Sequence, residues 1–321
     1  MASTSSAVTV GAVPANRRTD LLLLLVAIVW GSSYLAAKTA TASTPVLTVL
    51  FVRYAISAVA LLLFVRRISR KELRIGGVLG LTQAAVLILE TYGVTHTSAA
   101  NAGLIISLTL VLTPLLDRRR LPGRFYLAAA TCVGAVGLLM SSHGLHVPGV
   151  GDLLMLAAAV VRAGHVALVG RLATGLRPLQ LTTVQTLAGT ALFAIPAVSH
   201  LSAIPAVGWL QMAYLALFCS VFAFLVQTWA VQRTSASRAS LLLGTEPIWA
   251  VAIGIGLGSE QLTLTAALGA VLLLAGTTWG QAIERKARLG AGPLLVVGSV
   301  AGGNNDGGAV ARSGGREAAG C

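Results

Sequence analysis

The composition of this 321-residue chain excludes an ordinary soluble protein, because 56% of its residues are hydrophobic and only 10% are charged. Soluble domains average about 25% charged residues, since their surfaces face water. A net charge of +13 would suggest nucleic-acid binding in a soluble protein. Here the basic excess is better explained by cytoplasmic loops that fix the orientation of a membrane protein, so no nucleic-acid partner is expected.

Apolar runs long enough to cross a bilayer recur along almost the whole chain. A helix needs about 20 apolar residues to cross a hydrocarbon core of about 30 Å. The runs are continuous and lack the alternation of a membrane β-barrel, so they predict an all-α integral membrane protein. Ten transmembrane helices are predicted, over 21–40, 45–65, 75–95, 98–116, 124–141, 152–170, 179–198, 208–231, 238–257 and 263–282.

The two ends of the chain are predicted to be tails. Residues 1–20 are small and polar, and no small-residue cleavage site follows the run from Leu21. That run is therefore interpreted as a retained helix and not as a signal peptide. Residues 289–321 are rich in Gly and Ala, and we expect them to form a disordered tail.

The basic residues support this order of helices. If the N-terminus is cytoplasmic, every predicted inside loop contains Arg or Lys, and the predicted outside loops contain neither. A miscounted helix would have moved later basic loops to the wrong side. The pattern predicts a multi-pass protein of a bacterial-type inner membrane with both termini in the cytoplasm. The inside loops contain Arg66, Arg67, Arg70, Lys71, Arg74, Arg118, Arg119, Arg120, Arg124, Arg171, Arg177, Arg233, Arg238, Arg285, Lys286 and Arg288.

The two halves of the chain resemble each other, which predicts repeats over 21–141 and 152–283. Five helices in each repeat is an odd number, so the repeats must have opposite orientation in the membrane. Inverted repeats are typical of secondary transporters, whose substrate site lies near the midplane between the halves. Corresponding segments are those that start at Asp20 and Asp152, at Pro45 and Pro178, and at Thr97 and Thr234.

Several short motifs occur in a specific order along residues 21–285. They are Trp30-Gly31-Ser32-Ser33-Tyr34, Arg53, Thr91-Tyr92-Gly93, Thr97 to Gly103, Thr245-Glu246-Pro247 and Gly258-Ser259-Glu260-Gln261-Leu262. In this order and spacing they resemble the drug/metabolite transporter superfamily, specifically its ten-helix type with two EamA domains. The resemblance implies a carrier for small organic molecules, and it leaves a homodimer open.

Charged side chains inside the predicted helices are the best candidates for function. Placing such a charge at the bilayer centre costs at least about 2.5 to 3.5 kcal/mol, so it usually faces a polar path or a partner. Four ionisable side chains and one tryptophan lie roughly 12 to 20 Å from the start of their helix, which is near mid-depth. They are Trp30, Arg53, Arg162, His165 and Glu246. Glu90 lies nearer the outer face, where Lys38 is expected to meet it.

Each charged candidate has a functional and a structural interpretation. Arg53 would hold an anionic group of the substrate, or form an internal ion pair with Glu90 or Glu246. Glu246 precedes Pro247, which should free a backbone carbonyl and bend the helix, so the carboxylate would bind a proton or a cationic group. Alternatively, Glu246 satisfies polar groups of the helix itself.

Arg162 departs from the family pattern, because relatives usually carry an aromatic residue at this position. It suggests an anionic or carboxylate-bearing cargo, or an ion pair with Glu246. His165 aligns with Ser33 of the first repeat and would titrate near neutral pH or simply be hydrogen-bonded. The side chains of Trp30, Tyr34 and Trp249 are expected to line an aromatic cavity for an organic solute.

The sequence favours a secondary carrier over an enzyme or a channel. It contains no metal-protease helix motif, nucleophile elbow or phosphate-binding loop, so no enzyme, cofactor or metal is predicted. Gly149-Val150-Gly151-Asp152 resembles the motif of intramembrane aspartyl proteases, but no predicted span contains a second aspartate. We predict export of small organic metabolites, such as amino acids, by alternating access with proton or exchange coupling. The first alternative is an uptake carrier for a carboxylate or sugar-like solute, and a less favoured alternative is a channel.

Overall fold

The structure is a computed structural model that describes residues 17–116, 122–140, 149–173, 175–197, 201, 204–226, 242–261 and 263–290. The described part is helical and contains no strand, and its helices occupy all ten predicted spans. Most of the predicted N-terminal tail, the C-terminal tail from residue 291 and the first residues of the predicted span 238–257 lie outside it. The helices are α1 (Arg17–Thr41), α2 (Val46–Leu62), α3 (Arg70–His96), α4 (Ala99–Ile106), α5 (Thr109–Leu116), α6 (Gly123–Met140), α7 (Val150–Leu172), α8 (Pro178–Ala197), α9 (Ala206–Ala216), the π-helix η2 (Leu217–Phe222), α12 (Glu246–Gly256) and α13 (Leu264–Gly290).

Prolines and capping side chains determine where several helices begin. Pro45 and Pro205 directly precede α2 and α9, and Pro178 is the first residue of α8. Proline suits these positions because the first turn of a helix needs no backbone N–H. At the start of α3, Ser69 and Glu72 form a reciprocal capping box, so two otherwise unpaired amides are satisfied.

Three of the predicted spans are interrupted, which the sequence interpretation as continuous helices did not anticipate. The span 98–116 is divided into α4 and α5 by a turn at residues 107–108. The span 208–231 changes from α9 into η2 at Leu217. The span 238–257 is broken by a turn at residues 244–245, and α12 restarts at Glu246. Pro247 thus lies in a first turn, whereas we expected it to bend a continuous helix.

The outer surface is that of a protein in lipid. Six helical segments are long and apolar enough to cross a membrane. Large hydrophobic side chains are widely exposed, for example Ile195 at 89%, Leu63 at 79% and Leu264 at 78%. Contiguous apolar surface of this extent is not stable in water. The fold is therefore an all-α integral membrane fold, as predicted.

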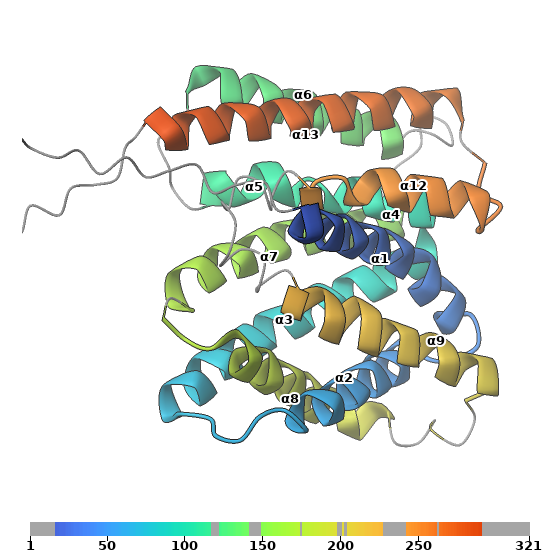
Figure 1. The fold of residues 1–321 in the computed structure, drawn as a ribbon. Helices are drawn as coiled ribbons and strands as arrows, with labels where there is room; N and C mark the ends of the chain where they lie inside the picture. Colours follow the sequence, from blue (N-terminus) through green and yellow to red (C-terminus); the bar gives the residue numbers. More distant parts are fainter. Residues whose placement is uncertain are drawn as a thin grey trace, which may run out of the picture.

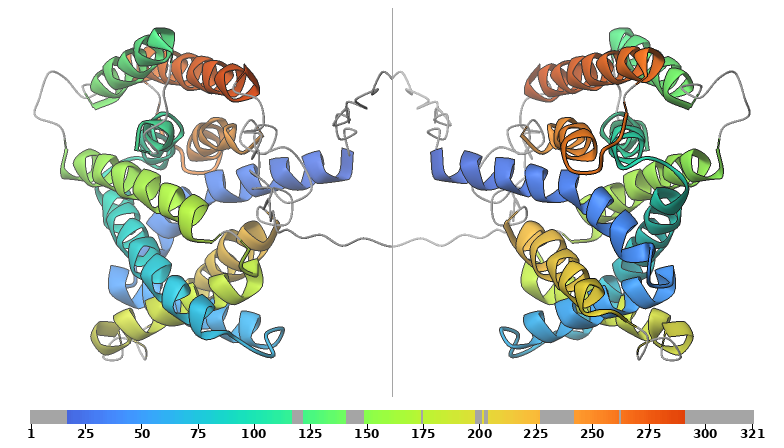
Figure 2. Two further views of the ribbon diagram at one scale, coloured as in Figure 1. Left: turned by 90° about the vertical axis from the view of Figure 1, so that its left-hand side faces the viewer. Right: turned by 90° about the vertical axis from the view of Figure 1, so that its right-hand side faces the viewer.

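The helix contacts are symmetric between the half of the chain that ends with α6 and the half that begins with α7. Exchanging the two halves leaves the same pairs of helices in contact. Helices α6 and α13 lie side by side at one edge, and α2 packs on α8 at the opposite edge (Figures 1 and 2). Each of these pairs joins the corresponding helices of the two halves. Likewise, α3 packs on α7 as α9 packs on α1. Inverted repeats would produce this arrangement, and we keep them as our proposal for its origin.

Candidate functional site

A cluster of partly buried charges joins α3, α7 and α12 beside α1. The guanidinium of Arg162 on α7 lies with Nη1 at 3.5 Å from Glu90 Oε1 and with Nη2 at 3.5 Å from Glu246 Oε2. The side chains of Arg162, Glu90 and Glu246 are 22%, 15% and 11% exposed, respectively. Opposite charges that face one another offset the cost of removing each from water. The sequence interpretation of Arg162 as a partner of Glu246 agrees with this geometry.

Two aromatic residues of α1 complete the surroundings of the guanidinium. The Cζ atom of Arg162 lies 5.5 Å from the ring centroid of Trp30, within the range of a cation–π contact. The hydroxyl of Tyr34 donates a hydrogen bond of 2.5 Å to Glu246 Oε1. Arg162 is therefore enclosed by two carboxylates and the electron-rich face of an indole ring.

The position of Glu246 depends on the break before α12. Because Glu246 is the first residue of α12, its carboxylate is favoured by the positive end of the helix dipole. Glycines on α1 and α4 let α12 approach closely. A Cβ atom at Gly31 would lie 2.8 Å from the backbone N of Ala250, and one at Gly103 would overlap the Cβ of Ala250. These contacts hold Tyr34 and Glu246 together.

The π-helix η2 joins the cluster to a second buried arginine. Arg53 on α2 is 7% exposed and donates from Nε to Ser220 Oγ at 3.0 Å. The indole Nε1 of Trp30 donates to the backbone carbonyl of Cys219 at 3.0 Å. Neighbouring residues of one π-helical turn thus hold α1 and α2, and such turns are frequent at functional sites. Sequence analysis did not select Cys219 or Ser220, although they are two small polar residues within an apolar run.

The remaining predicted site residues form none of these ion pairs. Ser33 Oγ donates to the carbonyl of Trp30 at 2.7 Å, within its own helix. His165 Nδ1 is 2.7 Å from Thr82 Oγ1, which matches the interpretation as a hydrogen-bonded histidine. Trp249 is half-buried, and its Nε1 has no hydrogen-bond partner among the described residues.

Two expected pairings are not present. Lys38 does not meet Glu90, because its Nζ lies 3.2 Å from Glu260 Oε1, and Glu90 pairs with Arg162 instead. Arg53 forms no ion pair with Glu90 or Glu246 in the part of the chain that the structure describes, where its recorded partner is Ser220. The sequence could not anticipate these outcomes, because each depends on which helices become neighbours.

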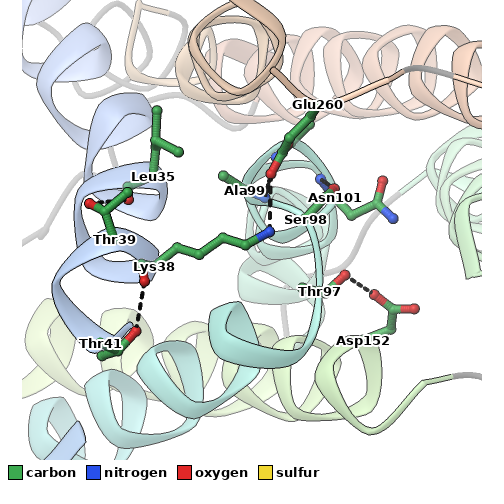
Figure 3. A network of polar contacts seen from close by, with 11 residues as sticks. Leu35, Lys38, Thr39, Thr41, Thr97, Ser98, Ala99, Asn101, Asp152 and Glu260 are labelled. Carbon is green, nitrogen blue, oxygen red and sulfur yellow. Dashed lines mark hydrogen bonds and ion pairs between the residues drawn. The ribbon is translucent and has the colours of Figure 1, made fainter. Parts of the chain in front are cut away.

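The contact between Lys38 and Glu260 belongs to a second polar network (Figure 3). Glu260 lies between α12 and α13, and its Oε1 and Oε2 accept the backbone N–H groups of Ala99 and Ala100 at 2.6 and 3.0 Å. These amides belong to the first turn of α4, which has no intrahelical acceptors for them. One carboxylate from the second half therefore caps a helix of the first half.

Comparison with known proteins identifies the family. Residues 17–142 and 149–279 each match the EamA-like transporter family. The chain belongs to this family. The resemblance to the drug/metabolite transporters is therefore confirmed, and the EamA-like chain is a multi-pass membrane transporter.

Several proteins with transporter names are similar to this EamA-like chain. An uncharacterized transporter of Archaeoglobus fulgidus is 28% identical over 267 residues, which cover 79% of this chain and 83% of that protein. The uncharacterized inner membrane transporter YedA of Escherichia coli is 26% identical over 74% of this chain and 81% of its own length. The uncharacterized transporter YyaM of Bacillus subtilis is 26% identical over 70% of this chain and 80% of its own. All three names are those of transporters.

A solved crystal structure has the same fold. It covers 85% of this chain and 99% of its own, with a TM-score of 0.55 and 17% sequence identity. At this identity the likeness concerns the arrangement of the helices alone. The candidate site therefore has to be argued from the side chains of the EamA-like chain itself.

Proposed function

We propose that this protein is a secondary active transporter that exports small organic metabolites, such as amino acids, by alternating access. The observation that carries the proposal is the enclosure of Arg162 by Glu90 and Glu246, all three of which belong to helices of a membrane fold. Ionisable groups at that depth are expensive, and in membrane proteins they usually mark a substrate or ion path.

The contacts of the cluster suit alternating access because most of them cross between the two halves. Trp30, Tyr34 and Glu90 belong to the first half, and Arg162 and Glu246 to the second. Three of the four contacts, Arg162 with Glu90, Arg162 with Trp30 and Tyr34 with Glu246, therefore join the halves. A movement of one half against the other would break these contacts, and a bound solute or proton would alter the cost of that movement.

We base the proposed energy source on the sequence and the proposed direction of transport on the family resemblance. The sequence has no nucleotide-binding motif, so we propose coupling to protons or to exchange. The export direction and the cytoplasmic position of both termini are part of the proposal. The second candidate is uptake of a carboxylate, because Arg53 uses only Nε toward Ser220 among the described residues. Its Nη atoms would then bind the anionic group.

The test is transport by purified protein in proteoliposomes. Metabolites that differ between cells with and without the gene supply the solutes to load. We expect efflux that saturates with concentration and shows counterflow, whereas a channel would give high flux without saturation.

Variants at the candidate residues test the site itself. Glu246→Gln and Arg53→Ala should abolish transport and leave membrane insertion intact, because each removes a buried charge of the path. Lys286→Gln, which neutralises an exposed residue near the end of α13, is the matched control and should transport normally. Normal transport by both site variants would remove these residues from the mechanism.

A further inference from the structure

We infer that Trp30, Glu90 and Glu246 form a binding site for a positively charged nitrogen group of the solute, a guanidinium or an ammonium. In the unloaded protein this site is occupied by the protein's own Arg162. The inference rests on the proposed function and names the chemical class of the cargo. It replaces the anionic cargo that Arg162 suggested at the level of the sequence.

The groups that converge on the guanidinium are those that bind cations in proteins. Glu90 and Glu246 each direct a carboxylate oxygen at it, and the ring of Trp30 lies under it. Trp is the best aromatic partner of a cation, and aromatic cages of this kind bind ammonium ligands. Tyr34 holds the other oxygen of Glu246, which fixes the carboxylate in this orientation.

Arg162 fills this site loosely. Charge-assisted hydrogen bonds between a guanidinium and a carboxylate are about 2.7 to 2.9 Å long. Both ion pairs of Arg162 are 3.5 Å long, which is longer than such a bond. Glu90 Oε1 is buried and accepts no hydrogen bond in the described structure. A smaller ligand cation would bring an N–H group close enough to satisfy it.

The charges around the site favour replacement of Arg162 over addition of a second cation. The helices around the site carry two guanidinium groups, of Arg53 and Arg162, and two carboxylates, of Glu90 and Glu246, and Arg53 donates to Ser220. His165 is held by Thr82, and Tyr34 is engaged with Glu246. A solute cation therefore enters when the side chain of Arg162 leaves. Arg162 then acts as a tethered competitor of the solute, and its removal should strengthen cation binding.

The experiment measures binding of methylguanidinium to the full-length protein by fluorescence of Trp30, with the other tryptophans replaced by Phe. N-methylurea is the neutral control ligand of similar shape. We expect Arg162→Gln to bind methylguanidinium at least roughly tenfold more tightly than the parent, and N-methylurea to bind neither. Arg162→Lys keeps a tethered cation and should bind as weakly as the parent. Adding Glu90→Gln to Arg162→Gln should abolish the gain.

Equal affinity of the parent and Arg162→Gln, or equal binding of the charged and neutral ligands, would overturn the inference. If Arg162→Gln does not fold, inhibition of solute efflux in proteoliposomes of the unmodified protein decides the matter. Methylguanidinium should inhibit and N-methylurea should not, and the reverse or no difference would overturn the inference. The two proposals fail separately: a protein that binds the cation but moves no solute contradicts only the proposed transport. A carrier whose efflux is insensitive to methylguanidinium contradicts only the cation site.

Discussion

Replacing Glu260 with Ala should destabilise the protein, because it leaves Ser98 as the capping side chain of α4 among the described residues. The carboxylate accepts two backbone N–H groups, from Ala99 and Ala100, and its side chain is only 13% exposed. Loss of a capping side chain costs about 0.5 to 2 kcal/mol, and a hydrogen bond to a charged group is worth about 1.5 to 3 kcal/mol. Lys38 is 36% exposed, so its ion pair adds at most about 1 kcal/mol. We expect a total loss of about 2 to 4 kcal/mol.

The assay is thermal unfolding of the purified protein, with Lys38→Ala as the matched control. With an unfolding entropy of about 2.1 cal/mol/K per residue, 1 kcal/mol shifts the unfolding midpoint of a 321-residue chain by about 1.5 °C. Glu260→Ala should therefore lower the midpoint by about 3 to 6 °C, and Glu260→Gln should lower it less, because the amide oxygen still accepts one N–H. Lys38→Ala should lower it by no more than about 1.5 °C. If Lys38→Ala lowers the midpoint as much as Glu260→Ala, the ion pair and not the helix cap holds this network together.

Two further outcomes follow from the packing. Gly103→Val should lower the unfolding midpoint, because a side chain there overlaps Ala250 and overpacking costs about 1 to 3 kcal/mol. The control, Gly134→Ala, should leave the midpoint unchanged or raise it, since nothing lies within 4 Å of the added Cβ. A midpoint unaffected by Gly103→Val would show that α4 and α12 can separate without cost. In a Cys321→Ser background, the buried Cys132 and Cys219 should react with N-ethylmaleimide only after denaturation, as mass spectrometry would show. Rapid labelling of the folded protein would mean that the interior opens readily.

Much of the fold could be predicted from the sequence because membrane spans are determined by composition. Apolar runs and the alternation of basic loops give the helices and their order without any knowledge of tertiary contacts. The interruptions within the predicted helices were harder to predict from the sequence. The break before α12 has a signal, Gly244 followed two residues later by the Glu246-Pro247 pair, whereas η2 contains neither Gly nor Pro. The energy that stabilises a π-helical turn comes from neighbouring helices, so the local sequence does not reveal it.

The candidate site was predicted residue by residue but not contact by contact. The cost of a buried charge singled out Arg162, Glu90 and Glu246, and these three side chains lie together. Their pairing depends on three helices from distant parts of the chain, which the sequence does not place relative to one another. Lys38 illustrates the difference: its partner came from the loop after α12 and not from α3.

The π-helical turn η2 also sets the rotational phase of the chain that follows it. A π turn holds one residue more than an α turn, which rotates later side chains by about 100° relative to an uninterrupted α-helix. Within this turn, the carbonyl of Cys219 faces the indole of Trp30 and the hydroxyl of Ser220 faces Arg53. If the turn rewound into α geometry, both acceptors would swing away together. The hydrogen bonds that join α1 and α2 to this segment would then break in a single step.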